Sequence, residues 1–234
     1  MVTAICDIGV SRRSVKENFG NIASIAFVDI KTREVFKIID FKKLIPKAGH
    51  FANDLTWDDK GNLYVTDSYA GAIYKVDDKY NTSVLLTDTT FKLKNQYSFG
   101  LNGIAFDKKN NSLIVSKLDE GKLFKIDLTN PSAFKEIKLE KALPADGILL
   151  QKDGSLVLVS SVNTPYDTTT SGKIYKLTTT NNWNSAGLVD TFDTGMPSAT
   201  TITLRKNELY TVHAYYFGKQ PVQEFHIQKV EFKK

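Results

Sequence analysis

Cysteine and histidine, the residues that most often bind zinc or iron, are scarce in this chain. Its 234 residues include one cysteine and three histidines. Cys6 therefore has no intrachain disulfide partner, and we interpret it as a small apolar residue in a strand. With no cluster of Cys or His at metal-ligand spacing, the sequence does not predict a zinc or iron site.

Long apolar runs are missing as well. No stretch approaches the ~18 apolar residues of a transmembrane helix, so we expect no membrane-spanning segment. Residues 1–20 lack the apolar core of about 7–15 residues that marks a signal peptide. The compartment stays open, since an upstream segment could have been removed. Two formal glycosylation sequons, at Asn81 and Asn110, are compatible with secretion.

Arginine is the third scarcity, with 4 Arg against 27 Lys in a chain of net charge +5. Nucleic-acid-binding proteins gather basic residues on one face and favour Arg for phosphate geometry. Here the lysines are scattered, with doublets only at 42–43, 108–109 and 233–234. The sequence therefore predicts no nucleic-acid partner.

The chain is rich, by contrast, in internal repetition. One repeated leucine recurs at intervals of 50, 43 and 53 residues, at Leu63, Leu113, Leu156 and Leu209. Repetition at this period indicates a solenoid, a propeller or an array. Each repeat carries three or four short runs of alternating apolar residues between Gly, Asn and Asp, and no window shows sustained helical periodicity. The sequence thus predicts an all-β protein, a β-propeller of four-stranded antiparallel blades in a single domain, residues 1–234.

About five blades are visible. Three span roughly residues 50–90, 99–141 and 144–192. Strands expected at 3–8, 22–29 and 35–39 precede them, and strands expected at 199–204, 208–213 and 223–231 follow them. Exposed sheet edges favour closure of the ring. Either five blades close, with the terminal strands sharing one blade, or a six-bladed ring lacks its start, which we favour. The third option is a homo-oligomer in which a partner subunit covers the open edge.

Two long polar stretches interrupt the repeats in corresponding places, residues 10–21 and residues 163–171. We expect both to be mobile loops on one face of the propeller. Loops in that position often line or cover a site.

One polar position recurs where each innermost strand begins. Asn53, Asn102 and Asp146 occupy it, 49 and 44 residues apart, and we call it the site position. Because innermost strands line the channel of a propeller, the three side chains would converge at one mouth of it. Ca²⁺ takes about 6–8 oxygen ligands, including carboxylates and amides. The alternative is that Asn and Asp before Gly are ordinary turn residues, repeated as every repeat protein repeats its turns.

The phrases FANDLTWDDKGNLYVTDS, GLNGIAFD and PADGILL resemble the regucalcin–gluconolactonase family of six-bladed propellers, to which strictosidine synthases and paraoxonases are more distantly related. The resemblance covers residues 51 to about 177. It implies that Asn53, Asn102 and Asp146 coordinate one divalent metal, Ca²⁺ or another cation. It also implies hydrolysis of small lactones or related esters, with Asp146 taking part in proton transfer.

The chain departs from the family at one ligand. The family has a Glu in the innermost strand of its first blade, and this chain has neither that strand nor that Glu. Asp7 and Glu17 lie in the first blade but match no motif. In the last repeat the aligned residue is Ala199 or Thr200.

In a working site the cation would polarise the substrate carbonyl, and a carboxylate or histidine would activate water. Asp146 is the first candidate for the base. His50 is the second, expected on a loop at the channel mouth, where the alternative is a solvated surface histidine. We expect His213 to pack against Tyr215 and Tyr216, and Asp67 to cap a turn.

Two functions therefore stay open. The first is a divalent-metal-dependent hydrolase of small lactones or esters. The second is a non-catalytic propeller scaffold that binds a protein or a small ligand through its top loops, since propellers serve many functions.

Overall fold

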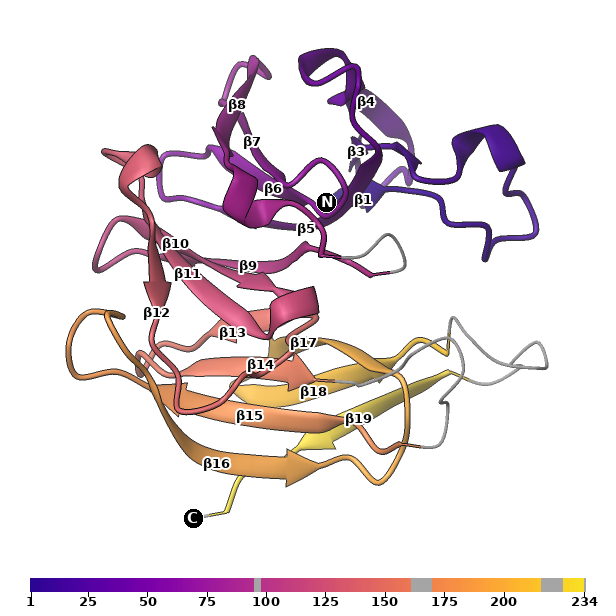
Figure 1. Ribbon diagram of the computed structural model, residues 1–234. Helices are drawn as coiled ribbons and strands as arrows, with labels where there is room; N and C mark the ends of the chain where they lie inside the picture. Colours follow the sequence, from indigo (N-terminus) through magenta and orange to yellow (C-terminus); the bar gives the residue numbers. More distant parts are fainter. Residues whose placement is uncertain (95–97, 161–169, 216–224, 234) are drawn as a thin grey trace. The chain divides into compact units, whose positions relative to one another are not determined.

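The computed structural model describes residues 1–94, 98–160, 170–215 and 225–233. They form five small sheets whose main strands are antiparallel, the blades of a five-bladed β-propeller (Figure 1). The predicted fold class and the count of about five blades are confirmed. The contacts divide the chain into two compact units, Met1–Asn102 (unit 1) and Gly103–Lys234 (unit 2). The single domain and the two alternative forms of the ring stay predictions.

Unit 1 contains two sheets. The first has three strands in the order β1-β3-β4. Its strands are β1 (Val2–Ile5), β3 (Ser24–Val28) and β4 (Val35–Asp40). The second has the order β2-β5-β6-β7-β8. Its strands are β2 (Asn21–Ile22), β5 (His50–Trp57), β6 (Leu63–Asp67), β7 (Ala72–Val76) and β8 (Thr82–Thr87). Three short 3₁₀ helices connect them: η1 (Lys16–Asn18), η2 (Lys42–Leu44) and η3 (Thr89–Phe91).

Unit 2 contains three sheets, and the strand β9 enters it from the end of unit 1. The first sheet consists of β9 (Leu101–Asp107), β10 (Ser112–Lys117), β11 (Lys122–Asp127) and β12 (Lys135–Ile137). The second consists of β13 (Ile148–Leu150), β14 (Leu156–Ser160), β15 (Lys173–Thr178) and β16 (Gly187–Asp193). The third consists of β17 (Ala199–Arg205), β18 (Glu208–His213) and β19 (His226–Val230). The 3₁₀ helices are η4 (Leu118–Glu120) and η5 (Pro131–Ala133).

Two expectations for the first sheet are wrong in detail. The strand expected at 22–29 is split, because the main chain of Ile22 pairs in parallel with Phe51 of β5, whereas residues 24–27 pair with β1. Cys6 lies one residue past the end of β1 and is exposed, so it is not a strand residue. The chain leaves the sheet at Asp7, whose Oδ1 accepts hydrogen bonds from Gly9 N and Ser14 Oγ.

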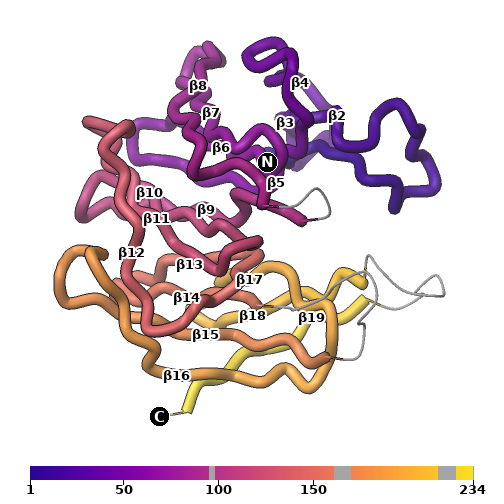
Figure 2. The backbone as a smooth tube through the Cα atoms, viewed as in Figure 1, coloured from indigo at the N-terminus to yellow at the C-terminus, as the bar shows by residue number. Residues whose placement is uncertain are grey.

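The stretch 10–21, expected to be a mobile loop, runs out from the first sheet and returns to β5 (Figure 2). It contains the 3₁₀ helix η1 and the short strand β2. Of the second expected loop, residues 163–171, all but the last two lie outside the described part of the chain.

Aspartates explain why the hairpins turn where they do. Between β5 and β6, Asp58 accepts hydrogen bonds through Oδ1 from the main-chain N of Lys60 and Asn62, both 2.9 Å away. Between β7 and β8, Asp77 accepts in the same way from Lys79 and Asn81. Such side-chain caps mimic a backbone turn, which is why Asp and Asn punctuate the repeats.

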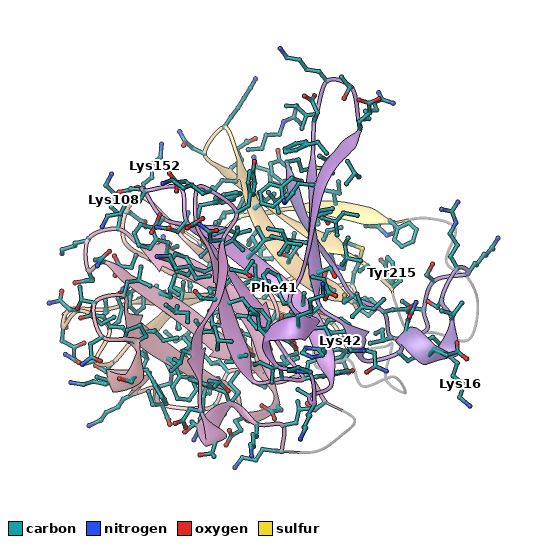
Figure 3. The ribbon with its side chains drawn as sticks, turned by 90° about the horizontal axis from the view of Figure 1, so that it is seen from above. Lys16, Phe41, Lys42, Lys108, Lys152 and Tyr215 are labelled. Carbon is teal, nitrogen blue, oxygen red and sulfur yellow. The ribbon has the colours of Figure 1, made fainter. Side chains whose placement is uncertain are left out.

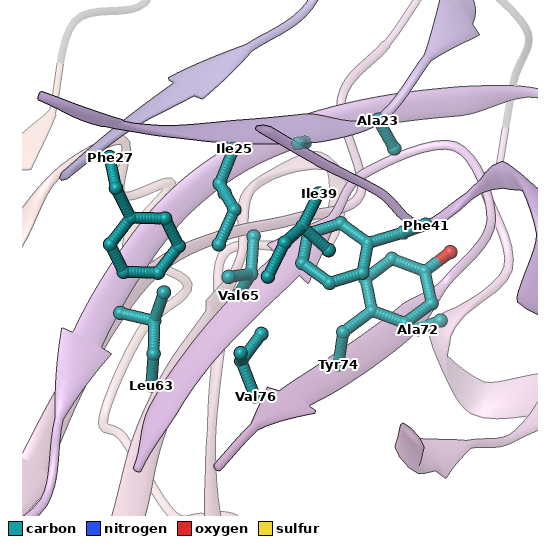
Figure 4. Packing of buried hydrophobic residues seen from close by; sticks show 11 residues of the cluster. Ala23, Ile25, Phe27, Ile39, Phe41, Leu63, Val65, Ala72, Tyr74 and Val76 are labelled. Carbon is teal, nitrogen blue, oxygen red and sulfur yellow. The ribbon is translucent and has the colours of Figure 1, made fainter. Parts of the chain in front are cut away.

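The core of unit 1 lies between its two sheets (Figure 4). It consists of small and branched apolar side chains around a stacked pair of aromatic rings. Phe41 lies 4.5 Å from Tyr74 between ring centroids, at an interplanar angle of 8°. The Tyr74 hydroxyl does not go unsatisfied, because it donates to Asp67 Oδ2 at 3.0 Å.

Among the described residues of unit 2, the core includes two clusters. The first contains Ile114, Leu123, Leu156 and Leu158 with the ring of Trp183. The second contains Val157, Val159, Ile174 and Ile202. Successive residues of β14 thus point into different clusters, as expected of a strand that is buried on both faces.

Several lysines lie on the surface. Lys16 and Lys42 of unit 1 and Lys108 and Lys152 of unit 2 are all exposed, and Figure 3 labels them. Among the described residues, no helix is long and apolar enough to cross a membrane.

Phe41 supports a stability test. The ring is fully buried, so Phe41→Ala should lower the free energy of unfolding by about 3–5 kcal/mol, as expected when a buried ring is removed. The matched control is Phe36→Ala, whose ring is 60% exposed; it should stay within about 0.5 kcal/mol of the wild type. Urea unfolding measures both, and equal losses would contradict the packing described above.

Candidate functional site

The side chain of Asn53 is held in one orientation. Its Nδ2 donates to Ser68 Oγ at 2.9 Å, and Ser68 Oγ in turn donates to Leu101 O at 2.5 Å. The serine proton is used on the carbonyl, so the serine oxygen can only accept from the Asn53 amide nitrogen. This bond leaves Asn53 Oδ1 as the acceptor end of the side chain.

A second hydroxyl connects the first two site positions. Thr66 Oγ1 accepts from Asp54 N at 3.1 Å and donates to Asn102 O at 2.7 Å. Thr66 and Ser68 are both fully buried. Together they join the strand segments that carry Asn53 and Asn102, both in unit 1.

The side-chain oxygen of Asn102 stands out by its hydrogen bonding. The residue is 3% exposed, and its Oδ1 is a buried side-chain oxygen that has no hydrogen-bond partner within the described residues. Leaving a buried acceptor unsatisfied costs about 1–3 kcal/mol, and such atoms are rare. An amide oxygen of this kind fits a hard cation such as Ca²⁺, which binds amide and carbonyl oxygens.

In unit 2 the site positions are joined directly through the main chain. Gly103 N donates to Asp146 O at 3.0 Å, and Gly147 N donates to Thr200 O at 2.8 Å. In both cases the N–H after one site position donates to the carbonyl of the next. This pattern identifies Thr200, rather than Ala199, as the site position of the last sheet.

The glycines after Asn102 and Asp146 are required by this close approach. A Cβ at Gly103 would lie 2.8 Å from Ile148 N, and a Cβ at Gly147 would lie 2.7 Å from Thr201 Cα. Neither glycine has a positive φ. The turn explanation is therefore wrong for Asn53 and Asn102, which lie inside β5 and β9. Asp146 does lie in a bend, just before β13.

His50 is not a loop residue. It is the first residue of β5 and is 0% exposed, so the expected position on a loop and the alternative of a solvated surface histidine are both wrong. Its Nδ1 lies 2.8 Å from Asp67 Oδ2 and its Nε2 lies 3.0 Å from Ile45 O. Both partners are acceptors, so both ring nitrogens donate.

This pairing explains the titration of the ring. The hydrogen bond to Asp67 raises the pKa of the His50 imidazole above its ordinary value, although burial opposes the rise. An imidazolium that donates both protons has no lone pair left to accept another. The predicted role of His50 as a general base therefore finds no support in this geometry.

Asp67 caps the turn after β6, as expected, and does more. Its Oδ1 accepts from Tyr69 N and Ala70 N at 3.1 and 3.0 Å and also from Phe51 N at 2.8 Å. Its Oδ2 accepts from His50 and Tyr74. The sequence identified the cap but gave no sign of the ion pair, because the two partners are 17 residues apart.

The corresponding strand ends of unit 2 also carry buried polar side chains. Lys117 ends β10 and contacts Asp119 and Glu120 at 2.7 and 2.6 Å. His213 ends β18; it lies 2.7 Å from Pro197 O and stacks against Tyr215. The predicted contact with Tyr215 is confirmed, while Tyr216 lies outside the described residues.

Other metal ligands are scarce. Within the described parts of the chain, no group of three or more His, Cys, Asp or Glu side chains could hold an ion. Any cation at the site positions would therefore depend on amide oxygens together with Asp146. Asp7 uses its Oδ1 within its own loop, and Glu17 lies in η1.

The His50–Asp67 pair makes stability depend on pH. Because the pKa of His50 is raised in the folded state, the contribution of the pair is present below about pH 6.5, the unfolded pKa. It is lost as the pH rises through the raised value. Urea unfolding of wild type and His50→Gln across this range should show a difference that shrinks at high pH. The control, exposed His226→Gln, should show no such trend; a constant wild-type advantage would refute the ion pair.

No family model and no curated protein matches the chain. Solved structures do. The luciferin-regenerating enzyme matches with a TM-score of 0.63 and 15% identity over 91% of this chain and 71% of its own. The Malassezia sympodialis allergen Mala s 1 matches with a TM-score of 0.63 and 17% identity over 92% and 69%. Virginiamycin B lyase from Staphylococcus aureus matches with a TM-score of 0.51 and 18% identity over 83% and 57%.

The chain thus spans little more than half of the lyase chain. Identities this low show the fold alone, a β-propeller. Membership of the regucalcin–gluconolactonase family stays a prediction.

Proposed function

We propose that this protein is a divalent-metal-dependent hydrolase of small lactones or esters, with Ca²⁺ held by Asn53, Asn102 and Asp146. The observation that carries the proposal is the buried Oδ1 of Asn102, which has no hydrogen-bond partner in the described part of the chain. It lies in the same unit as the Asn53 amide, which Ser68 fixes in place. The presence of enzymes among the structural neighbours is compatible with it.

Different residues of the chain would position the ligands and accept the proton. Ser68 orients the Asn53 amide, and Thr66 holds the main chain of Asn102. Asp146 accepts the proton of the attacking water, since it is the only carboxylate among the site positions. When bound, the cation supplies charge stabilisation to the oxygen of the substrate carbonyl.

Thr200, the site position of the last sheet, is neutral. It supplies a neutral hydroxyl where a further carboxylate would strengthen cation binding, and its Oγ1 lies 3.4 Å from Val212 O. We therefore expect weaker binding than a site with two carboxylates would give.

Calorimetry tests the metal site. Ca²⁺ titrated into EDTA-treated wild type should bind with micromolar or tighter affinity. Asn102→Ala, which removes an oxygen ligand, and Asp146→Asn, which removes the negative charge of the one carboxylate ligand, should each abolish the heat of binding. Asn130→Ala changes an exposed amide in another loop and should bind as the wild type does. A wild type that shows no binding would end the metal proposal and favour the non-catalytic scaffold.

Turnover tests the base. Asp146→Asn should lower kcat for a lactone or ester substrate by about 10²–10⁴-fold, the usual contribution of a general base. Thermal melting establishes that the variant is folded, since the main-chain hydrogen bonds of Asp146 to Gly103 and Val159 do not depend on its side chain. Full activity in a folded Asp146→Asn protein would exclude Asp146 as the essential base.

A further inference from the structure

Three aromatic rings form a closed triangle in unit 1, which we call the aromatic triad. Phe51 lies 5.1 Å from Phe99 and 5.5 Å from Tyr69, and Tyr69 lies 5.9 Å from Phe99, all measured between ring centroids. All three residues are only partly buried. They therefore differ from Phe41 and Tyr74, whose rings are in the core.

The triad adjoins the two site positions of unit 1. Phe51 and Asn53 of β5 both contact Ser68, because Phe51 O accepts from Ser68 N and Asn53 Nδ2 donates to Ser68 Oγ. Their neighbours His50 and Ala52 are fully buried. Tyr69 directly follows Ser68, the residue that holds the Asn53 amide. Phe99 precedes Asn102 by three residues.

The buried ion pair holds the main chain of two members of the triad, Phe51 and Tyr69. Phe51 N donates to Asp67 Oδ1 at 2.8 Å, and Phe51 O accepts from Ser68 N at 2.9 Å. Tyr69 N donates to the same oxygen of Asp67. His50 fixes that carboxylate from the other side. A surface fixed before the ligand arrives loses little conformational freedom on binding.

We propose that the aromatic triad binds an apolar ring of the ligand, which makes the preferred ligands ring-bearing lactones or esters rather than polyhydroxylated sugar lactones. This proposal rests on the proposed function for the reacting group, but the ring contact can be tested without turnover. Aromatic rings favour offset or edge contacts with another ring. They offer a polyhydroxylated ligand few hydrogen bonds in exchange for its water.

The experiment compares two lactams that cannot be hydrolysed as a lactone is. Piperidin-2-one is a bare six-membered ring, and 3,4-dihydroquinolin-2-one carries the same ring fused to benzene. Calorimetry with excess Ca²⁺ gives their dissociation constants. Wild type should bind the fused lactam at least about ten-fold more tightly. Phe99→Leu and Tyr69→Leu keep apolar volume but lose a ring, and each should reduce this preference about three- to ten-fold.

Two controls make the result specific. Tyr69→Phe keeps the ring and should keep the preference. Tyr80→Leu should also keep the preference, because it removes an exposed ring away from the triad. Tyr80 packs against Phe27, and Phe27 contacts Trp57, which lies at the opposite end of β5 from Phe51. Thermal melting establishes that each variant is folded. A reduced preference in one folded leucine variant, Phe99→Leu or Tyr69→Leu, is enough to support the inference.

The outcomes separate the two proposals. No preference in wild type, or an unchanged preference in both leucine variants, overturns the ring-binding inference even if lactones are hydrolysed. A preference that depends on the triad, in a protein that hydrolyses no lactone or ester, upholds the inference and removes the proposed function.

Discussion

The candidate site depends on one main-chain constraint, the hydrogen bond that joins consecutive site positions. Gly103 and Gly147 make it directly, from their N–H groups to the carbonyls of Asp146 and Thr200. In unit 1 the residue after Asn53 is Asp54, and the hydroxyl of Thr66 lies between the two groups: it accepts from Asp54 N and donates to Asn102 O. The direct contact requires glycine and the bridged contact does not. The repeats are therefore alike in backbone geometry where their sequences differ.

A buried ion pair connects this site to the core of unit 1. Asp67 receives the Tyr74 hydroxyl, and Tyr74 stacks on Phe41 at the centre of the packing. The same carboxylate receives His50 and the main chain of Phe51 and Tyr69. Burying charges is costly unless every hydrogen-bonding group is used, as it is here. Core packing, the ion pair and the aromatic triad therefore form one continuous structure.

The sequence pattern was enough to predict the sheets, because strands such as β6 and β10 are short apolar runs between turn residues. It was also enough to align Asn53, Asn102 and Asp146. It failed where the cause lay in a distant strand. Gly103 follows Asn102 as it would in a turn, yet glycine is required there by the hydrogen bond from Gly103 N to the carbonyl of Asp146, 43 residues later. His50 has the appearance of a loop residue because its partner, Asp67, belongs to another strand. The split at Ile22 likewise depends on pairing with Phe51.

The hydrogen bonds that join the site positions run from the N–H of the residue after one site position to the main-chain carbonyl of the next. The side chains at the site positions take no part in these bonds. Asn, Asp and Thr consequently occupy equivalent places on the same backbone. Architecture and chemistry are thus separately encoded. The complement of oxygen ligands can be rewritten one residue at a time, for instance by an acidic side chain in place of Thr200, while the sheets around it keep their register.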